Sequence, residues 1–208
     1  MTEMQKETVS EVIICNQEFF STAVKNIAEG GWSKLQVVAD FDRTLTRARV
    51  NGESGASCHG ILESLRCLSP EFKAETKALF EKYYPIEICH EKSMAEKIPY
   101  MIKWYEGAHN ALLKETVREK DLEIAVRESN VTFRDGARGL IELLHRNGVP
   151  FLVFSAGIGD IIREVFKQKL GLCLGESSLD TTHVVSNWME FKDEANDQGK
   201  LNVVSASL

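Results

Sequence analysis

The sequence lacks two features that would place it in common functional classes. It has no apolar run close to the roughly 20 residues that a helix needs to cross a bilayer, so we expect no membrane partner. It also has no excess of positive charge, because 25 Lys and Arg residues stand against 31 Asp and Glu residues, for a formal net charge of −6. Nucleic-acid polymers and anionic lipids attract basic surfaces. We therefore expect no nucleic-acid polymer as partner either.

The cysteines argue against a disulfide framework. There are five, an odd number, and they are widely scattered along the 208 residues. Residues 1–11 are polar and lack the apolar core of a secretory signal. We therefore expect reduced thiols and a cytoplasmic location. Since 43% of the residues are hydrophobic, a chain of this length can bury a core without disulfides.

Short apolar runs alternate with helical patterns. We predict strands over 35–39, 149–154 and 182–186, and helices within the first thirty residues, over 136–146 and over 161–170. This alternation is typical of βαβ units, in which helices cover both faces of a mostly parallel sheet. The fold class that we predict is therefore α/β.

The stretch from Asn51 to Asn130 is different, because it shows helical periodicity and no convincing strand. We predict a helical cap over 51–130, inserted after the first strand into a core formed by 1–50 and 131–208. An insertion at this point can lie over the carboxyl edge of the sheet, where ligands bind in open α/β sheets.

Two carboxylates follow the first predicted strand directly. Alternation along an extended segment directs Asp40 and Asp42 to one side and Phe41 to the other. Such a pair can bind a hard cation such as Mg²⁺, or divide the roles of nucleophile and general acid/base. The alternative is a pair of acids that cap a turn. We favour a catalytic or cation-binding role for the two acids because they follow an apolar strand and precede Thr-Leu-Thr.

The second predicted strand leads into Ser155, Ala156 and Gly157, followed by Gly159 and Asp160. A serine and small residues at a strand–helix junction offer a hydroxyl and backbone N–H groups to an anion, and glycines let a ligand approach the backbone. An ordinary tight turn would look similar. Together with the acid pair at the same sheet edge, however, the segment predicts a phosphate site.

Other clusters have simpler explanations. The Cys-His pairs at 58–59 and 89–90, with Cys67, lack the spacing typical of zinc sites. Trp104 and Tyr105 suggest stacking on a base, although Tyr105 lies on an apolar helical stripe and is more typical of a core residue. The arginines at 43, 47 and 49 are more typical of a solvated face than of a phosphate clamp.

Several segments resemble a known family. They are 38–42, 81–87, 96–101 with Trp104 and Tyr105, 154–160 and 184–189. The acid pair and the Ser-Ala-Gly run resemble motifs I and II of the haloacid dehalogenase (HAD) superfamily. The cap segments narrow the resemblance to the cytosolic 5′-nucleotidase type III, or pyrimidine 5′-nucleotidase, family. This implies a HAD-like Rossmannoid core with a helical cap.

The resemblance also implies roles for individual residues. Asp40 would be the nucleophile that forms an aspartyl-phosphate, and Asp42 would protonate the leaving oxygen and then activate water. Mg²⁺ would bind the Asp40 carboxylate and the backbone carbonyl of Asp42. Ser155, Ala156 and Gly157 correspond to the phosphate-binding turn. Glu87 corresponds to the carboxylate that contacts the base.

The sequence departs from the family in two places. Ala108 occupies the position of a base-binding Ser, which leaves the base preference open. The family also continues with a phosphate-binding Lys and a Gly-Asp-Ser-x-x-Asp segment whose first Asp completes the metal site. Lys192, Lys200, Asp193, Glu194 and Asp197 give no match to these groups. We therefore expect divergence after Phe191 and a C-terminally truncated member of the family.

The resemblance implies Mg²⁺-dependent hydrolysis of nucleoside 5′-monophosphates, either pyrimidine nucleotides or 7-methylguanosine monophosphate. An alternative is a catalytically impaired form that only binds a nucleotide or a partner. A third reading is a phosphotransferase that uses the same aspartyl-phosphate. The sequence leaves the oligomeric state open.

Overall fold

The computed structural model describes residues 13–174 and 181–191, together with the backbone of residues 201–204. Within them, a four-stranded sheet has the order β1-β4-β5-β6. Strands β1 (Val37–Ala39), β4 (Phe151–Ile158) and β5 (Thr182–Phe191) are parallel, whereas β6 (Leu201–Val204) pairs antiparallel with β5. The predicted α/β class with a parallel sheet is confirmed.

Helices occupy most of the remaining described chain. They are α1 (Gln17–Gly30), α2 (Cys58–Glu63), α3 (Pro70–Glu87), α4 (Met94–Leu112), α5 (Glu119–Glu128), α6 (Ala137–Arg146) and α7 (Gly159–Val165), with short helical turns η1 (Trp32–Lys34), η2 (Phe41–Leu45) and η3 (Phe166–Leu170). None of the described helices is both long and apolar enough to span a bilayer.

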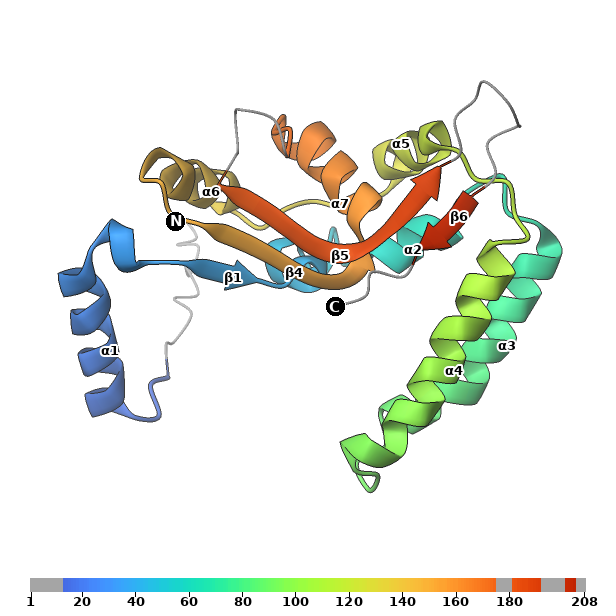
Figure 1. Cartoon of the computed structure of the whole chain (residues 1–208), viewed down its shortest axis with the longest axis horizontal. Coiled ribbons are helices and arrows are strands. Elements are labelled where there is room, and N and C mark those ends of the chain that lie inside the picture. The colour runs from blue at the N-terminus through green and yellow to red at the C-terminus, as the bar shows by residue number, and fades with distance from the viewer. Residues whose placement is uncertain (1–12, 175–180, 192–200, 205–208) are drawn as a thin grey trace, which may run out of the picture.

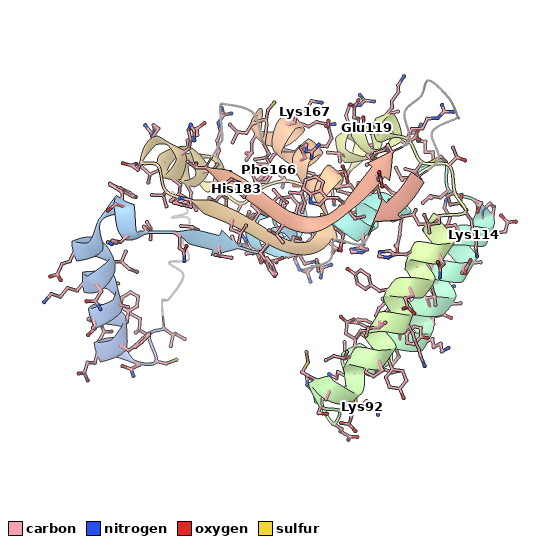
Figure 2. All side chains as sticks on the ribbon, in the orientation of Figure 1. Lys92, Lys114, Glu119, Phe166, Lys167 and His183 are labelled. Atoms are coloured by element: carbon pink, nitrogen blue, oxygen red, sulfur yellow. The ribbon has the colours of Figure 1, made fainter. Side chains whose placement is uncertain are left out.

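The helices are arranged unequally around the sheet. Figure 1 shows α5, α6 and α7 on one side, while α1 and the α3–α4 hairpin extend from the other side at opposite ends of the molecule. Lys92 lies at the far tip of this hairpin and Lys114 at its base near the sheet (Figure 2). The hairpin is the main body of the inserted cap.

The core lies between the sheet and the helices α5, α6 and α7. Phe41, which follows β1, is fully buried and packs with Phe133 and Phe166 at ring-centroid distances of 5.9 and 6.1 Å. Figure 2 shows Phe166 on this helical side of the sheet. The residue between the two acids therefore anchors their turn to the core.

The other face of the sheet is exposed in the part of the chain that the structure describes. Val38 is 60% exposed, Phe154 is 51% exposed, and Val185 beside it is 38% exposed. Helix α1 contributes no buried residue. The expectation of helices on both faces is therefore wrong for the described residues, although the apolar runs that suggested it are typical of strands buried on both faces.

The insertion contains a hairpin that the sequence analysis missed. Strands β2 (Arg49–Val50) and β3 (Glu53–Ser54) pair across Asn51 and Gly52. Both turn residues have positive φ, 51° and 86°, as a two-residue hairpin turn requires, and Asn-Gly is the strongest sequence signal for that turn. The expectation of no strand after Asn51 is therefore wrong at this point.

The insertion leaves and rejoins the core at one place. Thr46 and Phe133 form an isolated antiparallel bridge. Beside it, the Arg47 N–H donates to the Thr132 carbonyl at 2.9 Å, and the Arg134 N–H donates to the Leu45 carbonyl at 2.9 Å. This arrangement fits a cap inserted after the first strand. The exact boundaries of 51–130 for the cap stay a prediction.

Candidate active site

Asp40 directly follows β1 and precedes η2, and Asp42 lies within η2. Asp40 is exposed, and its carboxylate accepts a hydrogen bond from the Thr44 hydroxyl at 2.9 Å. Asp42 is half-buried, whereas Phe41 between them is fully buried. Phe41 thus enters the core, whereas the side chains of Asp40 and Asp42 on either side of it remain at least partly accessible.

The backbone of this turn is held in an unusual conformation. Arg43 has φ of 62°, in the left-handed region that non-glycine residues rarely occupy. Its N–H donates to the hydroxyl of the buried Thr46 at 2.9 Å. The Arg134 guanidinium donates to the carbonyls of Arg43 and Thr44, both at 2.8 Å. These bonds fix the strained turn that aims the acids.

The Asp42 carboxylate meets the start of the cap. Both of its oxygens accept from the Cys58 N–H, at 3.0 and 3.1 Å. Burial raises the pKa of Asp42, while the Cys58 N–H and the nearby His59 oppose the rise and Asp40 adds to it. A carboxyl group with a raised pKa retains a proton more readily and can act as a general acid.

The predicted phosphate turn is part of β4 rather than a loop after it. β4 pairs with β5 at Phe154–Val185 and again at Ile158–Asn187. Three residues of β4, Ser155 to Gly157, therefore oppose only Ser186. This is a bulge, a feature common next to active sites because it redirects side chains. The strand continues beyond its predicted end because it resumes pairing at Ile158.

Side chains replace the ladder bonds that the bulge disrupts. The Ser155 hydroxyl accepts from the Gly157 N–H at 3.1 Å, and the Ser186 hydroxyl donates to the Gly157 carbonyl at 2.8 Å. The Asn187 amide donates to the carbonyls of Ala156 and Gly157 at 2.9 and 3.1 Å. Because Ser155 accepts from its own segment, its hydroxyl hydrogen can be donated elsewhere.

The glycines of this segment serve close packing. A Cβ on Gly157 would lie 2.9 Å from the sulfur of Cys58 and 3.1 Å from the Ser155 hydroxyl. A Cβ on Gly159 would lie 2.6 Å from the ring of Trp188. The chain's own packing therefore requires glycine at both positions, and the expectation that they also let a ligand approach the backbone stays a prediction.

A cavity of about 640 Å³ lies between the cap and the carboxyl ends of β4 and β5. Its walls are mostly apolar and aromatic, with two histidines, two glutamates and several smaller polar groups; the lining residues that matter below are Phe80, Tyr84, Glu87, Trp104, Tyr105, His59, His109, Ala156 and Asn187. Glu87 is exposed at the C-terminal end of α3. The volume of this cavity and the aromatic and polar groups in its walls suit a small ligand with an aromatic part.

The N-terminus of α2 lies between Asp42 and the cavity and contacts both. Cys58 binds Asp42 through its N–H, while its neighbours Ser57 and His59 line the cavity. The Cys58 sulfur in turn lies against Gly157, so the acid turn and the β4 bulge meet at this residue. Glu87 lies in the cavity wall, and no contact joins it to the acids.

Tyr105 and two histidines line the cavity, although the sequence pattern indicates a core position for Tyr105. Tyr105 is 40% exposed and lines the cavity, so its assignment to the core is wrong. His59 and His109 also line the cavity. Burial, followed by the charge of His59, lowers the pKa of His109. Their roles depend on contacts between distant segments, which a single helical pattern does not reveal.

The remaining candidate sites receive no support. The described residues contain no group of three His, Cys, Asp or Glu side chains able to hold a metal, and Cys58 is buried while Cys67 is exposed. Arg47 pairs with Asp135, and Arg49 donates to the Gly52 carbonyl at 3.4 Å. The acidic residues 193, 194 and 197 and the lysines 192 and 200 lie outside the described residues.

Sequence comparison identifies relatives. A sequence model described as Pyrimidine 5′-nucleotidase (UMPH-1) matches residues 43–207. The match includes the cap and the β4 bulge, begins just after Asp42, and continues past Phe191 through β6. The 7-methylguanosine phosphate-specific 5′-nucleotidase of Gallus gallus is 38% identical over 191 residues, which are 92% of this chain and 63% of that protein. Its Homo sapiens counterpart is 37% identical over 173 residues, 83% of this chain and 56% of that protein.

A solved structure supports the same relationship. The crystal structure of cytosolic 5′-nucleotidase IIIB bound to cytidine matches with a TM-score of 0.70 and 30% identity, over 88% of this chain and 56% of that one. The chain therefore spans little more than half the length of these relatives. A Caenorhabditis elegans relative, 35% identical over 188 residues, is named putative cytosolic 5′-nucleotidase 3. The family model alone covers most of the sequence, and the chain belongs to the pyrimidine 5′-nucleotidase (UMPH-1) family.

Proposed function

We propose that this chain carries the active site of a cytoplasmic 5′-nucleotidase that hydrolyses nucleoside 5′-monophosphates to nucleoside and phosphate. The observation that carries the proposal is the junction at Cys58. There the half-buried carboxyl of Asp42, bound by the Cys58 N–H, adjoins an aromatic cavity large enough for a nucleoside. A phosphate at the acids and a base in the cavity would be parts of one ligand.

The two acids would have different roles because their environments differ. Asp40 is exposed and is held by the Thr44 hydroxyl, so its free oxygen would attack phosphorus and form an aspartyl-phosphate. The raised pKa of Asp42 suits a group that protonates the leaving ribose oxygen and afterwards takes a proton from the attacking water. Ser155, Ala156 and Gly157 would bind the phosphate oxygens.

The same residues fit a magnesium ion. Mg²⁺ is usually bound by one or two carboxylates together with substrate phosphate oxygens. Asp40 offers an exposed carboxylate at the end of β1, and Asp42 offers its carbonyl in the adjacent turn. The ion would neutralise the charge that accumulates when phosphate meets the carboxylate of Asp40.

The base would be held in the cap. Phe80, Tyr84 and Trp104 supply aromatic surface in the cavity wall, and Glu87 supplies a carboxylate that can accept hydrogen bonds from a base. The relatives are named for 7-methylguanosine phosphate, and the solved structure contains cytidine. We therefore propose pyrimidine nucleotides and 7-methylguanosine monophosphate as the substrates to test.

The test is phosphate release from uridine, cytidine and 7-methylguanosine monophosphates, with and without Mg²⁺. Asp40→Asn should abolish turnover because an amide is a poor nucleophile, and Asp42→Asn should lower it by about 10²–10⁴-fold. Asp135→Asn is the control, since Asp135 is exposed on the core surface. Nucleotide binding without any phosphate release by the parent chain would instead support a role in binding only, and phosphate transfer to an added nucleoside would support a phosphotransferase.

A further inference from the structure

We propose that Asn187 and Tyr105 form a latch between the cap and the phosphate segment, and that both are positioning residues for nucleotide hydrolysis. The inference rests on the proposed function for its kinetic consequence, but its structural part is independent of activity. The latch joins three elements that are distant in sequence: α4 of the cap, the bulge of β4, and β5.

Asn187 is the central residue of the latch. Its amide nitrogen lies 2.9 Å from the Ala156 carbonyl, 3.1 Å from the Gly157 carbonyl and 3.2 Å from the Tyr105 hydroxyl. The two carbonyls belong to the bulge, where β4 and β5 are out of register. Backbone groups without ladder partners need other partners. Asn187 therefore determines which way these peptide groups point.

Tyr105 extends the bonding to the cap. Its hydroxyl donates to the Ala156 carbonyl at 3.0 Å and accepts from the Asn187 amide. Its ring packs edge-on against His109, one turn further along α4, at a centroid distance of 5.1 Å. The same carbonyl thus receives hydrogen bonds from β5 and from the cap. The hydrogen bonds that run from the Asn187 amide through the Tyr105 hydroxyl to the Ala156 carbonyl form a chain in which each bond polarises the next.

The latch would set the distance between the two ends of the ligand. The phosphate end would meet the bulge at Ser155 to Gly157, whereas the base end would meet cap residues such as Glu87 and Trp104. A nucleotide must contact both at once, so a loosened cap would weaken nucleotide binding. A small phosphate ester would contact only the bulge and the acids, so its KM would rise less than that of a nucleotide.

The experiment compares Tyr105→Phe with Tyr100→Phe. Both tyrosines lie on α4 and both are 40% exposed, but only Tyr105 contacts the bulge. Hydrogen exchange of the backbone, measured without any ligand, should become faster in residues 155–158 and in α4 for Tyr105→Phe and remain unchanged for Tyr100→Phe. Asn187→Ala should accelerate exchange in the same segments. The double variant should add little, because both side chains act on one carbonyl.

The kinetic arm uses the same variants. Tyr105→Phe should raise KM for each nucleotide by about two- to ten-fold, the effect of losing one ordinary hydrogen bond, and raise KM for p-nitrophenyl phosphate by a smaller factor, because that ester contacts the bulge but not the cap. A loss that differs among bases would overturn the latch in favour of direct base contact. If backbone hydrogen exchange in residues 155–158 and in α4 is as slow in Tyr105→Phe as in Tyr100→Phe, the latch is overturned as well. If the parent chain hydrolyses no nucleotide, the proposed function fails, and the exchange data still test the latch.

Discussion

Replacing Gly157 with alanine tests how tightly the acid turn and the β4 bulge are packed together. The added Cβ would lie 2.9 Å from the Cys58 sulfur and 3.0 Å from the Cys58 Cβ. Gly157 does not have a positive φ, so the effect would be steric rather than a change of backbone preference. Overpacking of a tight core site costs about 1–3 kcal/mol. For a chain of this size, that is a fall in Tm of about 2–12 °C.

Gly139→Ala is the matched control. Gly139 lies within α6, and nothing lies within 4 Å of the position that its Cβ would occupy. Because alanine is favoured over glycine inside a helix, this variant should gain about 1 kcal/mol. The same substitution should thus have opposite signs at the two positions, as measured by urea denaturation.

A double variant identifies the neighbour responsible. Cys58→Ala removes the sulfur and leaves a small void, so it should destabilise the chain on its own. Combined with Gly157→Ala, it should cost less than the sum of the two single variants, because the void accepts the new methyl group. If Gly157→Ala is as stable as the parent chain, or if the two effects add, the close packing inferred at this junction is incorrect.

Two further predictions concern the acid pair and the cap. Because burial raises the pKa of Asp42 in the folded chain, the stability that depends on its protonation is present at low pH and is lost as the pH rises through the raised pKa. Asp42→Asn should therefore stabilise the chain relative to the parent more at about pH 7 than at about pH 4, close to the ordinary pKa of an aspartate, as urea unfolding at the two pH values can show. If Glu87 binds the base as proposed, Glu87→Ala should raise KM for nucleotides and spare a small phosphate ester, because only the proposed base contact is removed; equal losses on both substrates would make Glu87 structural.

The sequence predicted the burial of Phe41 between the two acids because the signal is local. An apolar strand followed by Asp-Phe-Asp places Phe41 in the core and the acids outside it, and the structure has this arrangement. The Asn51-Gly52 hairpin has an equally local signal in its turn residues. The assignment of roles to Asp40, Asp42, Glu87 and the β4 segment stays a prediction.

The bulge and the latch were not predictable from local patterns. The bulge at Ser155 depends on where β5 resumes pairing, and its carbonyls are bonded by Asn187, more than thirty residues later. Tyr105 followed an apolar helical stripe, so periodicity placed it in the core. Only the approach of α4 to β4 shows that its hydroxyl binds the Ala156 carbonyl. The bulge and the latch therefore depend on contacts between segments that are distant in sequence, which local patterns do not reveal.

The bridge between Thr46 and Phe133 has a consequence for how members of such a family can diversify. The whole insertion departs and returns through two neighbouring points of the core. The two ends of the insertion, beside Thr46 and Phe133, are therefore neighbours in the core. Their separation does not depend on the length of the chain inserted between them. Loop-closure entropy also grows only slowly with loop length. The insertion can accordingly change in length while its attachment at Thr46 and Phe133 stays in place, so the turn that carries Asp40 and Asp42 keeps its anchor.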